Sequence, residues 1–157
     1  MKFIIHTDGG ARGNPGPAAI GIIIEPIKPT DTNKLKIIEI GKRIGETTNN
    51  VAEYTAVREA LKEIKSLRQR RTSLWQDKSK VKSKEKEFLE INFHLDSNLV
   101  VNQLNGTFKV KDSNLRNLLM EIRMLEQEVG GLISYNHIPR EQNRRADFLV
   151  NKALDND

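Results

Sequence analysis

The stretch that decides the fold reads Thr7-Asp8-Gly9-Gly10-Ala11-Arg12-Gly13-Asn14-Pro15-Gly16-Pro17. It follows a short apolar run at residues 3–5, so an acidic residue, Asp8, stands where a strand ends and a turn begins. Glycine and proline at this density favour a tight hairpin, or a close approach of the backbone to a ligand. The pattern predicts strands at residues 3–8 and 18–25. It leaves Asp8 open to two interpretations, a solvated turn residue or a ligand-binding carboxylate.

Beyond this stretch, apolar residues alternate in short segments or recur at helical spacing. The predicted strands are residues 3–8, 18–25, 34–44, 88–95 and 132–138; one helix is capped by Asn49-Asn50, and the others span residues 97–104, 113–129 and 143–154. The order βββαβααβα predicts an α/β fold with a five-stranded mixed sheet, three strands antiparallel and two parallel, flanked by helices.

We expect a single domain over residues 1–157, interrupted once. Residues 68–87 have no apolar period and include the run Lys78-Ser79-Lys80-Val81-Lys82-Ser83-Lys84, which predicts a basic insertion or mobile loop. Between Lys65 and Glu87 there are nine Lys and Arg residues against three acids, which concentrates the formal net charge of +5 in this segment. The insertion is interpreted as a solvated loop or, alternatively, as a tether that contacts nucleic acid.

The composition, 37% hydrophobic and 30% charged residues over 157 positions, is typical of a soluble globular protein. We expect no membrane span, because no apolar run approaches the roughly 20 residues that a span needs, and no signal peptide. The chain has no cysteine, which excludes disulfides and thiolate metal sites and is consistent with a cytoplasmic protein.

Three more acidic residues stand in contexts similar to that of Asp8. Glu53 lies in the first turn of its predicted helix, on the apolar side, where a solitary charge is costly to bury. Asp96 ends the fourth strand, at the edge of the sheet where ligands bind in open α/β folds. Asp147 lies in the first turn of the last helix. Taken alone, helix capping accounts for Asp96, and the helix dipole accounts for Asp147.

If the first and fourth strands are parallel neighbours, Asp8 and Asp96 stand side by side, and two helices can bring Glu53 and Asp147 to them. Four carboxylates at one place repel one another and are tolerable around divalent cations. Hard oxygen ligands select Mg²⁺ or Mn²⁺. Two such ions about 4 Å apart would clamp the attacking water and the leaving oxygen of a phosphodiester.

Four segments together resemble the type 1 ribonuclease H (ribonuclease HI) family across nearly the whole chain. They are Thr7-Asp8-Gly9-Gly10 with Gly13-Asn14-Pro15-Gly16-Pro17, then Thr47-Thr48-Asn49-Asn50-Val51-Ala52-Glu53, then Asp96-Ser97-Asn98-Leu99-Val100-Val101, and finally His137-Ile138-Pro139-Arg140-Glu141-Gln142-Asn143-Arg144-Arg145-Ala146-Asp147. The resemblance implies a ribonuclease H-like fold and gives Asp8, Glu53, Asp96 and Asp147 the catalytic and metal-binding positions of the family. The implied reaction is endonucleolytic hydrolysis of RNA paired with DNA, with two Mg²⁺ or Mn²⁺ ions per site, leaving a 5′-phosphate and a 3′-hydroxyl.

The same resemblance implies substrate contacts at six positions. Those facing the minor groove of the hybrid, where 2′-hydroxyls distinguish RNA from DNA, are Gly10, Ala11, Asn14, Asn49 and Asn50. Thr48 matches a position that holds a phosphate of the DNA strand. Helix capping by Asn49 and Asn50 is compatible with this role.

His137 stands ten residues before Asp147, the spacing at which family members carry a mobile histidine that helps the product leave. The alternative is a half-buried polar side chain at the end of a strand. His6 and His94 alternate within strands and are interpreted as structural or exposed residues.

The chain departs from the family pattern at two positions. Glu46 stands where relatives often have a basic residue, and Asp112 stands where many complete the phosphate pocket with asparagine. Both changes put negative charge near an expected phosphate, so weaker binding of the DNA strand is expected. We expect no amino-terminal hybrid-binding domain. We also expect no basic protrusion between the two central helices, because the segment that joins them, residues 106–112, is short.

The partner expected from these observations is an RNA–DNA hybrid, with no obligate protein partner and a monomeric state. One competing interpretation is a catalytically weak nucleic-acid-binding domain of the same fold, although retention of all four acids argues against it. Two further interpretations are a relative that acts on double-stranded RNA and a relative that acts in DNA strand transfer.

Overall fold

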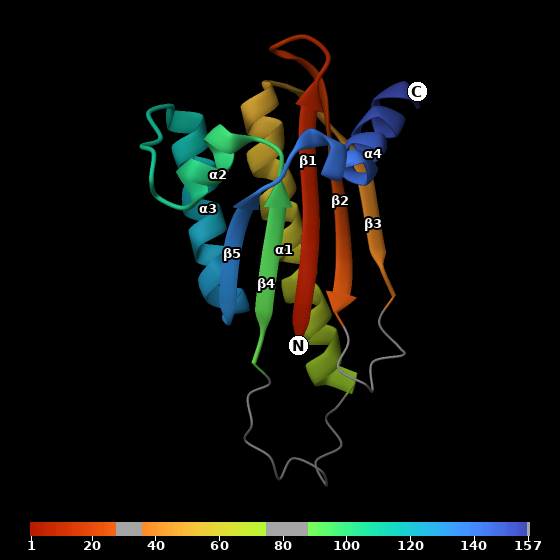
Figure 1. The fold of residues 1–157 in the computed structure, drawn as a ribbon, viewed down its shortest axis with the longest axis vertical. Helices are drawn as coiled ribbons and strands as arrows, with labels where there is room; N and C mark the ends of the chain where they lie inside the picture. The colour runs from red at the N-terminus through yellow and green to blue at the C-terminus, as the bar shows by residue number, and fades with distance from the viewer. Residues whose placement is uncertain (28–35, 75–87, 157) are drawn as a thin grey trace, which may run out of the picture.

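The computed structural model describes residues 1–27, 36–74 and 88–156, with the backbone alone described at residues 71–74. The described residues form one sheet whose strands lie in the order β3-β2-β1-β4-β5 (Figure 1). The strands are β1 (Lys2–Ala11), β2 (Gly16–Ile27), β3 (Ile38–Thr47), β4 (Glu90–Leu95) and β5 (Leu132–His137). This arrangement confirms the predicted mixed sheet and the predicted order of elements.

One half of the sheet is an antiparallel meander. β1 pairs with β2 so that Asp8 lies opposite Gly21, and β2 pairs in turn with β3. The turn between β1 and β2 is closed by a hydrogen bond of 2.8 Å from Arg12 N to Pro17 O. The glycine- and proline-rich stretch therefore forms the tight hairpin that its composition predicts.

The other half of the sheet is parallel. β4 lies between β1 and β5, parallel to both, and His6 of β1 is in register with His94 of β4. Asp8 and Asp96 each lie two residues beyond this pair. The two acids therefore emerge at the same edge of the sheet, at the carboxyl ends of adjacent parallel strands.

Helices cover the two faces of the sheet unequally. α1 (Asn49–Leu74) packs on β1 and β2 and against α3 (Ser113–Val129), and these two helices lie behind the sheet in Figure 1. α2 (Asn98–Leu104) follows β4. α4 (Arg144–Asp155), which a short 3-10 turn at Arg140–Gln142 precedes, lies in front of the sheet and contacts β2, β3 and β1.

The main core fills the space between the sheet and α1 with α3. Alternate strand residues such as Ile22, Phe93 and Leu95 are fully buried there, together with Tyr54 and Ile64 of α1. A second, smaller cluster joins Ala19 to Val150 and Leu154 under α4. α1 and α4 are thus anchored on opposite faces of the sheet.

One predicted boundary needs correction. The sequence predicts an insertion at residues 68–87, whereas α1 continues as a helix to Leu74. Arginine and glutamine are good helix formers, Arg68 donates to the backbone oxygen of Val129, and Arg70 pairs with Glu63 at 3.2 Å. Periodicity missed this extension because no apolar stripe marks it. The rest of the predicted insertion, residues 75–87, lies outside the described residues, as does the start of the predicted third strand.

Within the described ranges, none of the helices is both long enough and apolar enough to cross a bilayer.

Candidate active site

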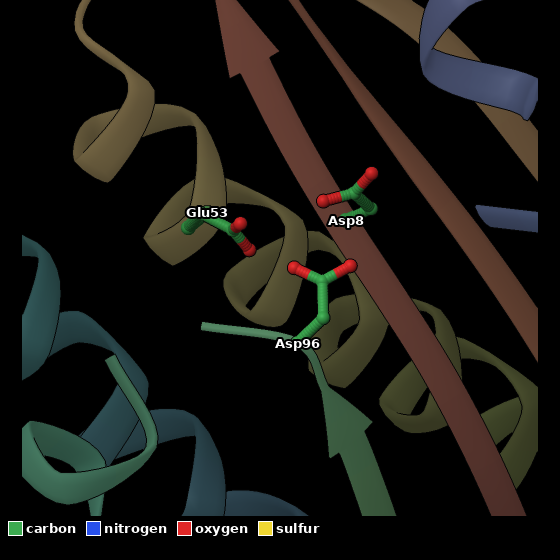
Figure 2. Close-up of side chains that lie close together, drawn as sticks. All are labelled: Asp8, Glu53 and Asp96. Carbon is green, nitrogen blue, oxygen red and sulfur yellow. The ribbon is translucent and has the colours of Figure 1, made fainter. Parts of the chain in front are cut away.

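Three carboxylates meet at the carboxyl edge of the sheet. Asp8 comes from β1, Asp96 follows β4, and Glu53 reaches them from α1, as Figure 2 shows. One carboxylate oxygen from each lies within 4.8 Å of the others. The side chains of Asp8 and Glu53 are buried, with 8% and 7% of their surface exposed. The structure therefore brings together three of the four acids in the spacing needed for shared cations.

The position of Glu53 depends on a close approach of α1 to β1. A Cβ atom on Gly9 would lie 2.3 Å from the backbone carbon of Ala52 and 2.5 Å from the backbone nitrogen of Glu53. Only glycine allows this contact, because those atoms belong to backbone that cannot move aside cheaply. The residue after Asp8 thus sets how near the Glu53 carboxylate lies to that of Asp8.

Asp147 reaches the same place from the opposite face of the sheet. It lies in the first turn of α4, is exposed, and is close enough to Asp8 to raise the pKa of that carboxyl. α4 can approach because Gly21, opposite Asp8, has no side chain; a Cβ there would lie 2.1 Å from the backbone oxygen of Ala146. All four acids line one open pocket with a volume of about 440 Å³.

The acids perturb one another strongly. The pKa of Asp8 is raised to about 7, first by burial and then by the charges of Asp96 and Asp147, while a hydrogen bond from the Gly9 backbone opposes the rise. The pKa of Glu53 is raised well above its ordinary value by burial and by the charges of Asp8 and Asp96. Without cations, burial and mutual repulsion therefore favour the protonated forms of these two carboxyl groups.

The donor set fits hard divalent cations. It consists of carboxylate oxygens without nitrogen or sulfur ligands, which is the chemistry of Mg²⁺ and Mn²⁺ sites. Glu53 Oε2 is buried and has no hydrogen-bond partner within the described part of the chain. A buried oxygen without a donor is costly, and a cation held between Glu53 and its neighbours would satisfy it.

Two residues of the site have roles that the sequence did not reveal. Asn143, 1% exposed, donates from Nδ2 both to the backbone oxygen of Thr7 at 2.9 Å and to Asp96 Oδ2 at 3.1 Å. Arg140 lines the pocket, and its charge opposes the rise of the Glu53 pKa. Both lie in the His137–Asp147 motif. An asparagine before a helix and an arginine in a loop are common, so neither residue indicated a role in the site from the sequence.

The residues that cap α1 and α2 differ from the predicted ones. α1 is capped by Thr48, whose Oγ1 accepts from Val51 N at 3.2 Å, rather than by the Asn49-Asn50 pair. α2 is capped by Ser97 instead of Asp96, so the Asp96 carboxylate is left to face the other acids. The capping explanation for Asp96 is therefore wrong.

Four of the six predicted substrate-contact residues line the pocket, and the other two do not. Gly10, Ala11, Asn49 and Asn50 line it directly. Asn49 Oδ1 accepts from Ala11 N at 2.8 Å, and Asn14 Oδ1 accepts from Asn49 N at 3.0 Å, so the β1–β2 turn is tied to the start of α1. Asn14 and Thr48 stand just outside the pocket lining. Their contacts with substrate stay a prediction.

His137 is the last residue of β5, in register with Leu95, and it is exposed rather than half-buried. It is not among the residues that line the carboxylate pocket. His6 and His94 stack on each other with ring centroids 5.1 Å apart on the sheet, away from the pocket lining.

The two departures from the family pattern have different environments. Asp112 caps α3, its Oδ1 accepting from Leu115 N at 2.9 Å, so its carboxylate has a structural role. Glu46 is exposed on β3, opposite Pro17.

The sequence matches the family model described as RNase H over residues 1–155. Ribonuclease HI of Halobacterium salinarum is 34% identical over 150 residues, which cover 96% of this chain and 63% of that protein. A bifunctional protein of Mycobacterium tuberculosis is 35% identical over 155 residues, covering 99% of this chain and 36% of that protein. The chain thus spans less than two thirds of the length of these relatives.

Solved structures agree with this similarity. The crystal structure of RNase H1 from Halobacterium salinarum superposes with a TM-score of 0.76 at 33% identity, covering 100% of both chains. LC11-RNase H1, isolated from compost and solved in complex with an RNA/DNA hybrid, superposes with a TM-score of 0.74 at 40% identity, covering 98% of this chain and 96% of that one.

Proposed function

The chain belongs to the ribonuclease H family, and on this premise we propose that it hydrolyses the RNA strand of RNA–DNA hybrids with the help of divalent metal ions. The products would carry a 5′-phosphate and a 3′-hydroxyl. The observation that carries this proposal is the group formed by Asp8, Glu53 and Asp96, whose oxygens lie within 4.8 Å of one another. Without cations, carboxylates this close in a partly buried pocket are costly to ionise, because burial and mutual repulsion both oppose their charges.

Asp8, Glu53 and Asp96 would hold Mg²⁺ or Mn²⁺, and Asp147 would complete the site from α4. Ions bound there supply Lewis-acid stabilisation of phosphodiester oxygens and lower the pKa of bound water. Asp8 and Glu53 must lose their protons before they can act as ligands, since both have raised pKa values. The Arg140 guanidinium, which lines the same pocket, would favour the ionised Glu53 and the incoming phosphate.

Asn14 and Asn49 would read the RNA strand. The Oδ1 atom of each accepts a backbone hydrogen, so the Nδ2 groups of these exposed side chains remain available as donors to 2′-hydroxyls or base edges. Asn50 lines the pocket beside them. At Gly10, the nearest atom to an added Cβ is 3.6 Å away, in Val150, so a glycine leaves room for the sugar-phosphate backbone.

Thr48 would hold a phosphate of the DNA strand. Its Oγ1 accepts the Val51 backbone hydrogen, which leaves the hydroxyl hydrogen for an outside acceptor. His137 would assist proton transfer or product release from the exposed end of β5, next to the strand that leads to Asp96. Every residue in this scheme comes from one chain, so a monomer would suffice, and the expected location is the cytoplasm.

The test is cleavage of labelled substrates. The protein is incubated with RNA–DNA hybrid, duplex RNA or duplex DNA, each with Mg²⁺, Mn²⁺ or EDTA, and the product ends are identified. We expect the RNA strand of the hybrid to be cleaved only when Mg²⁺ or Mn²⁺ is present. The Asp8→Asn variant should not cleave it under any of these conditions. Glu90→Gln, which removes a carboxylate at the far end of β4, serves as the matched control and should cleave normally.

Two results would count against the proposal. Metal-dependent cleavage of duplex RNA in preference to the hybrid would assign the chain to the class of relatives that act on double-stranded RNA. Tight binding of the hybrid without cleavage, under any metal, would instead indicate a binding domain.

A further inference from the structure

Arg12 sits in the β1–β2 turn at the rim of the carboxylate pocket. The turn is fixed on both sides of it, because Ala11 N donates to Asn49 and Asn14 accepts from the Asn49 backbone. The Arg12 backbone is itself fixed by its hydrogen bond to Pro17 O. The guanidinium therefore extends from a rigid base, among residues that the proposed function assigns to substrate.

The partner of this guanidinium is the last residue of α4. Arg12 Nη2 lies 2.5 Å from Asp155 Oδ1, with 48% and 63% of the two side chains exposed. The end of α4 is also held from β3, where Arg43 donates to the backbone oxygen of Leu154 at 3.1 Å. Asp155 is thus presented to Arg12 by a helix end that is anchored independently.

The Arg12–Asp155 pair matters because the pocket has more acidic than basic side chains. Among the described residues, those lining the pocket include four acids and two cations, Arg12 and Arg140. A polyanionic substrate needs cations at the rim, yet the charge of Arg12 is neutralised by Asp155. An ion pair this exposed is weak, whereas a phosphate can receive two parallel hydrogen bonds from a guanidinium.

We propose that Arg12 binds a backbone phosphate of the nucleic acid and that Asp155 occupies the guanidinium until the phosphate displaces it. Asp155 is then an intramolecular competitor that lowers affinity for nucleic acid without touching it. This inference rests on the proposed function, because it takes an RNA–DNA hybrid as the ligand.

The test is a double-mutant cycle on hybrid binding. Fluorescence anisotropy of a labelled hybrid is measured over a series of salt concentrations, with Asp8→Asn as the background so that the ligand stays intact. We expect Asp155→Asn to bind about two- to fivefold more tightly. Arg12→Gln should bind more weakly, with the salt slope reduced by about one. The double variant Arg12→Gln/Asp155→Asn should bind as Arg12→Gln does.

Glu39→Gln provides the matched control. Glu39 forms an ion pair of 2.7 Å with Arg145, another residue of α4, and the two side chains have similar exposure, 51% and 57%. This substitution changes the net charge as Asp155→Asn does, but it releases Arg145, which does not line the carboxylate pocket, so affinity should stay unchanged.

The inference is overturned if Asp155→Asn tightens binding no more than Glu39→Gln, or if it tightens binding equally in the Arg12→Gln background. Cleavage of the same hybrid by the unmodified protein is measured in parallel. If that protein does not cleave the hybrid, the proposed function fails; if it cleaves while the cycle shows no coupling, the Arg12–Asp155 inference alone fails.

Discussion

Asn143 holds the carboxylate of Asp96 through a hydrogen bond of 3.1 Å from its side-chain Nδ2 to Asp96 Oδ2. The same amide group donates to the backbone oxygen of Thr7, the residue before Asp8. Asn143 also stands directly before α4, which carries Asp147. One buried side chain therefore links three of the elements that supply the proposed metal ligands.

We expect Asn143→Ala to weaken metal binding by about 10- to 100-fold, the range found when groups that orient metal ligands are removed. The free energy of unfolding should fall by about 1–3 kcal/mol, because the Thr7 oxygen loses its donor. Isothermal titration calorimetry with Mn²⁺ measures the first effect, and denaturant unfolding without metal measures the second.

Asn105→Ala is the matched control, since Asn105 also donates from Nδ2 to a backbone oxygen, that of Tyr135 at 3.1 Å, but has no hydrogen bond to a carboxylate within the described part of the chain. It should lower stability and leave metal affinity unchanged. Equal metal affinity in Asn143→Ala and the unmodified protein would limit Asn143 to a structural role.

Asp8→Asn should abolish cleavage and leave the fold intact. The pKa of Asp8 is raised from 3.8 to about 7 in the folded protein, so its protonated form favours folding. Its contribution to stability is fully present below pH 4 and is lost as the pH rises through about 7. At pH 8, the metal-free protein therefore carries a destabilisation of up to about 4 kcal/mol from this group, which the neutral amide relieves.

Thermal unfolding without metal at pH 4 and pH 8 measures this effect. The midpoint of Asp8→Asn should equal or exceed that of the unmodified protein at pH 8, and the difference should shrink at pH 4. An unfolded variant, or retained turnover, would argue against a metal cluster at Asp8.

Metal affinity should increase with pH. Asp8, with a pKa of about 7, and Glu53, whose pKa is also raised, compete for protons in the metal-free protein and must release them to bind a cation. Calorimetry in buffers of different ionisation enthalpy should detect proton release on Mg²⁺ binding at pH 6, decreasing above pH 8. Binding that releases no protons at pH 6 would mean that the cation does not reach these two carboxylates.

The sequence was sufficient to predict the sheet and the meeting of Asp8, Asp96 and Glu53, because strand ends and helical spacing depend on local patterns. It could not show the distances, which depend on contacts between residues far apart in the chain, such as Gly21 with the backbone of Ala146. The part played by Asn143 was hidden for the same reason: its partners Thr7 and Asp96 lie 136 and 47 residues away.

The end of α1 could not be predicted from the sequence for a different reason. An exposed helical extension buries no apolar stripe. The basic residues before Leu74 therefore show no apolar periodicity that would distinguish a helix from a loop. The identity of the cap was missed because Thr48, Asn49 and Asn50 are all good capping residues, and only the hydrogen bond to Val51 distinguishes Thr48.

His137→Ala should lower the turnover number by roughly 10- to 100-fold, within or just below the usual contribution of a general acid or base. Binding of the hybrid should barely change, because the exposed imidazole is not among the pocket-lining residues. Single-turnover and steady-state rates, measured separately, distinguish an effect on chemistry from one on product release. An unaltered rate for His137→Ala together with a large loss for Arg140→Gln would transfer this role to Arg140.

Gly9→Ala should damage the site through the position of α1. The added Cβ would lie 2.3 Å from the backbone carbon of Ala52, so the first turn of α1 must move away and take Glu53 with it. Overpacking of this kind costs typically about 1–3 kcal/mol of unfolding free energy. We expect a loss of that size in denaturant unfolding, together with weaker Mn²⁺ binding in calorimetry. Gly10→Ala is the stability control, because its Cβ would meet only Val150, at an ordinary contact distance of 3.6 Å. If Gly9→Ala kept both the stability and the metal affinity of the unmodified protein, the close approach of α1 to β1 would not set the spacing of the carboxylates.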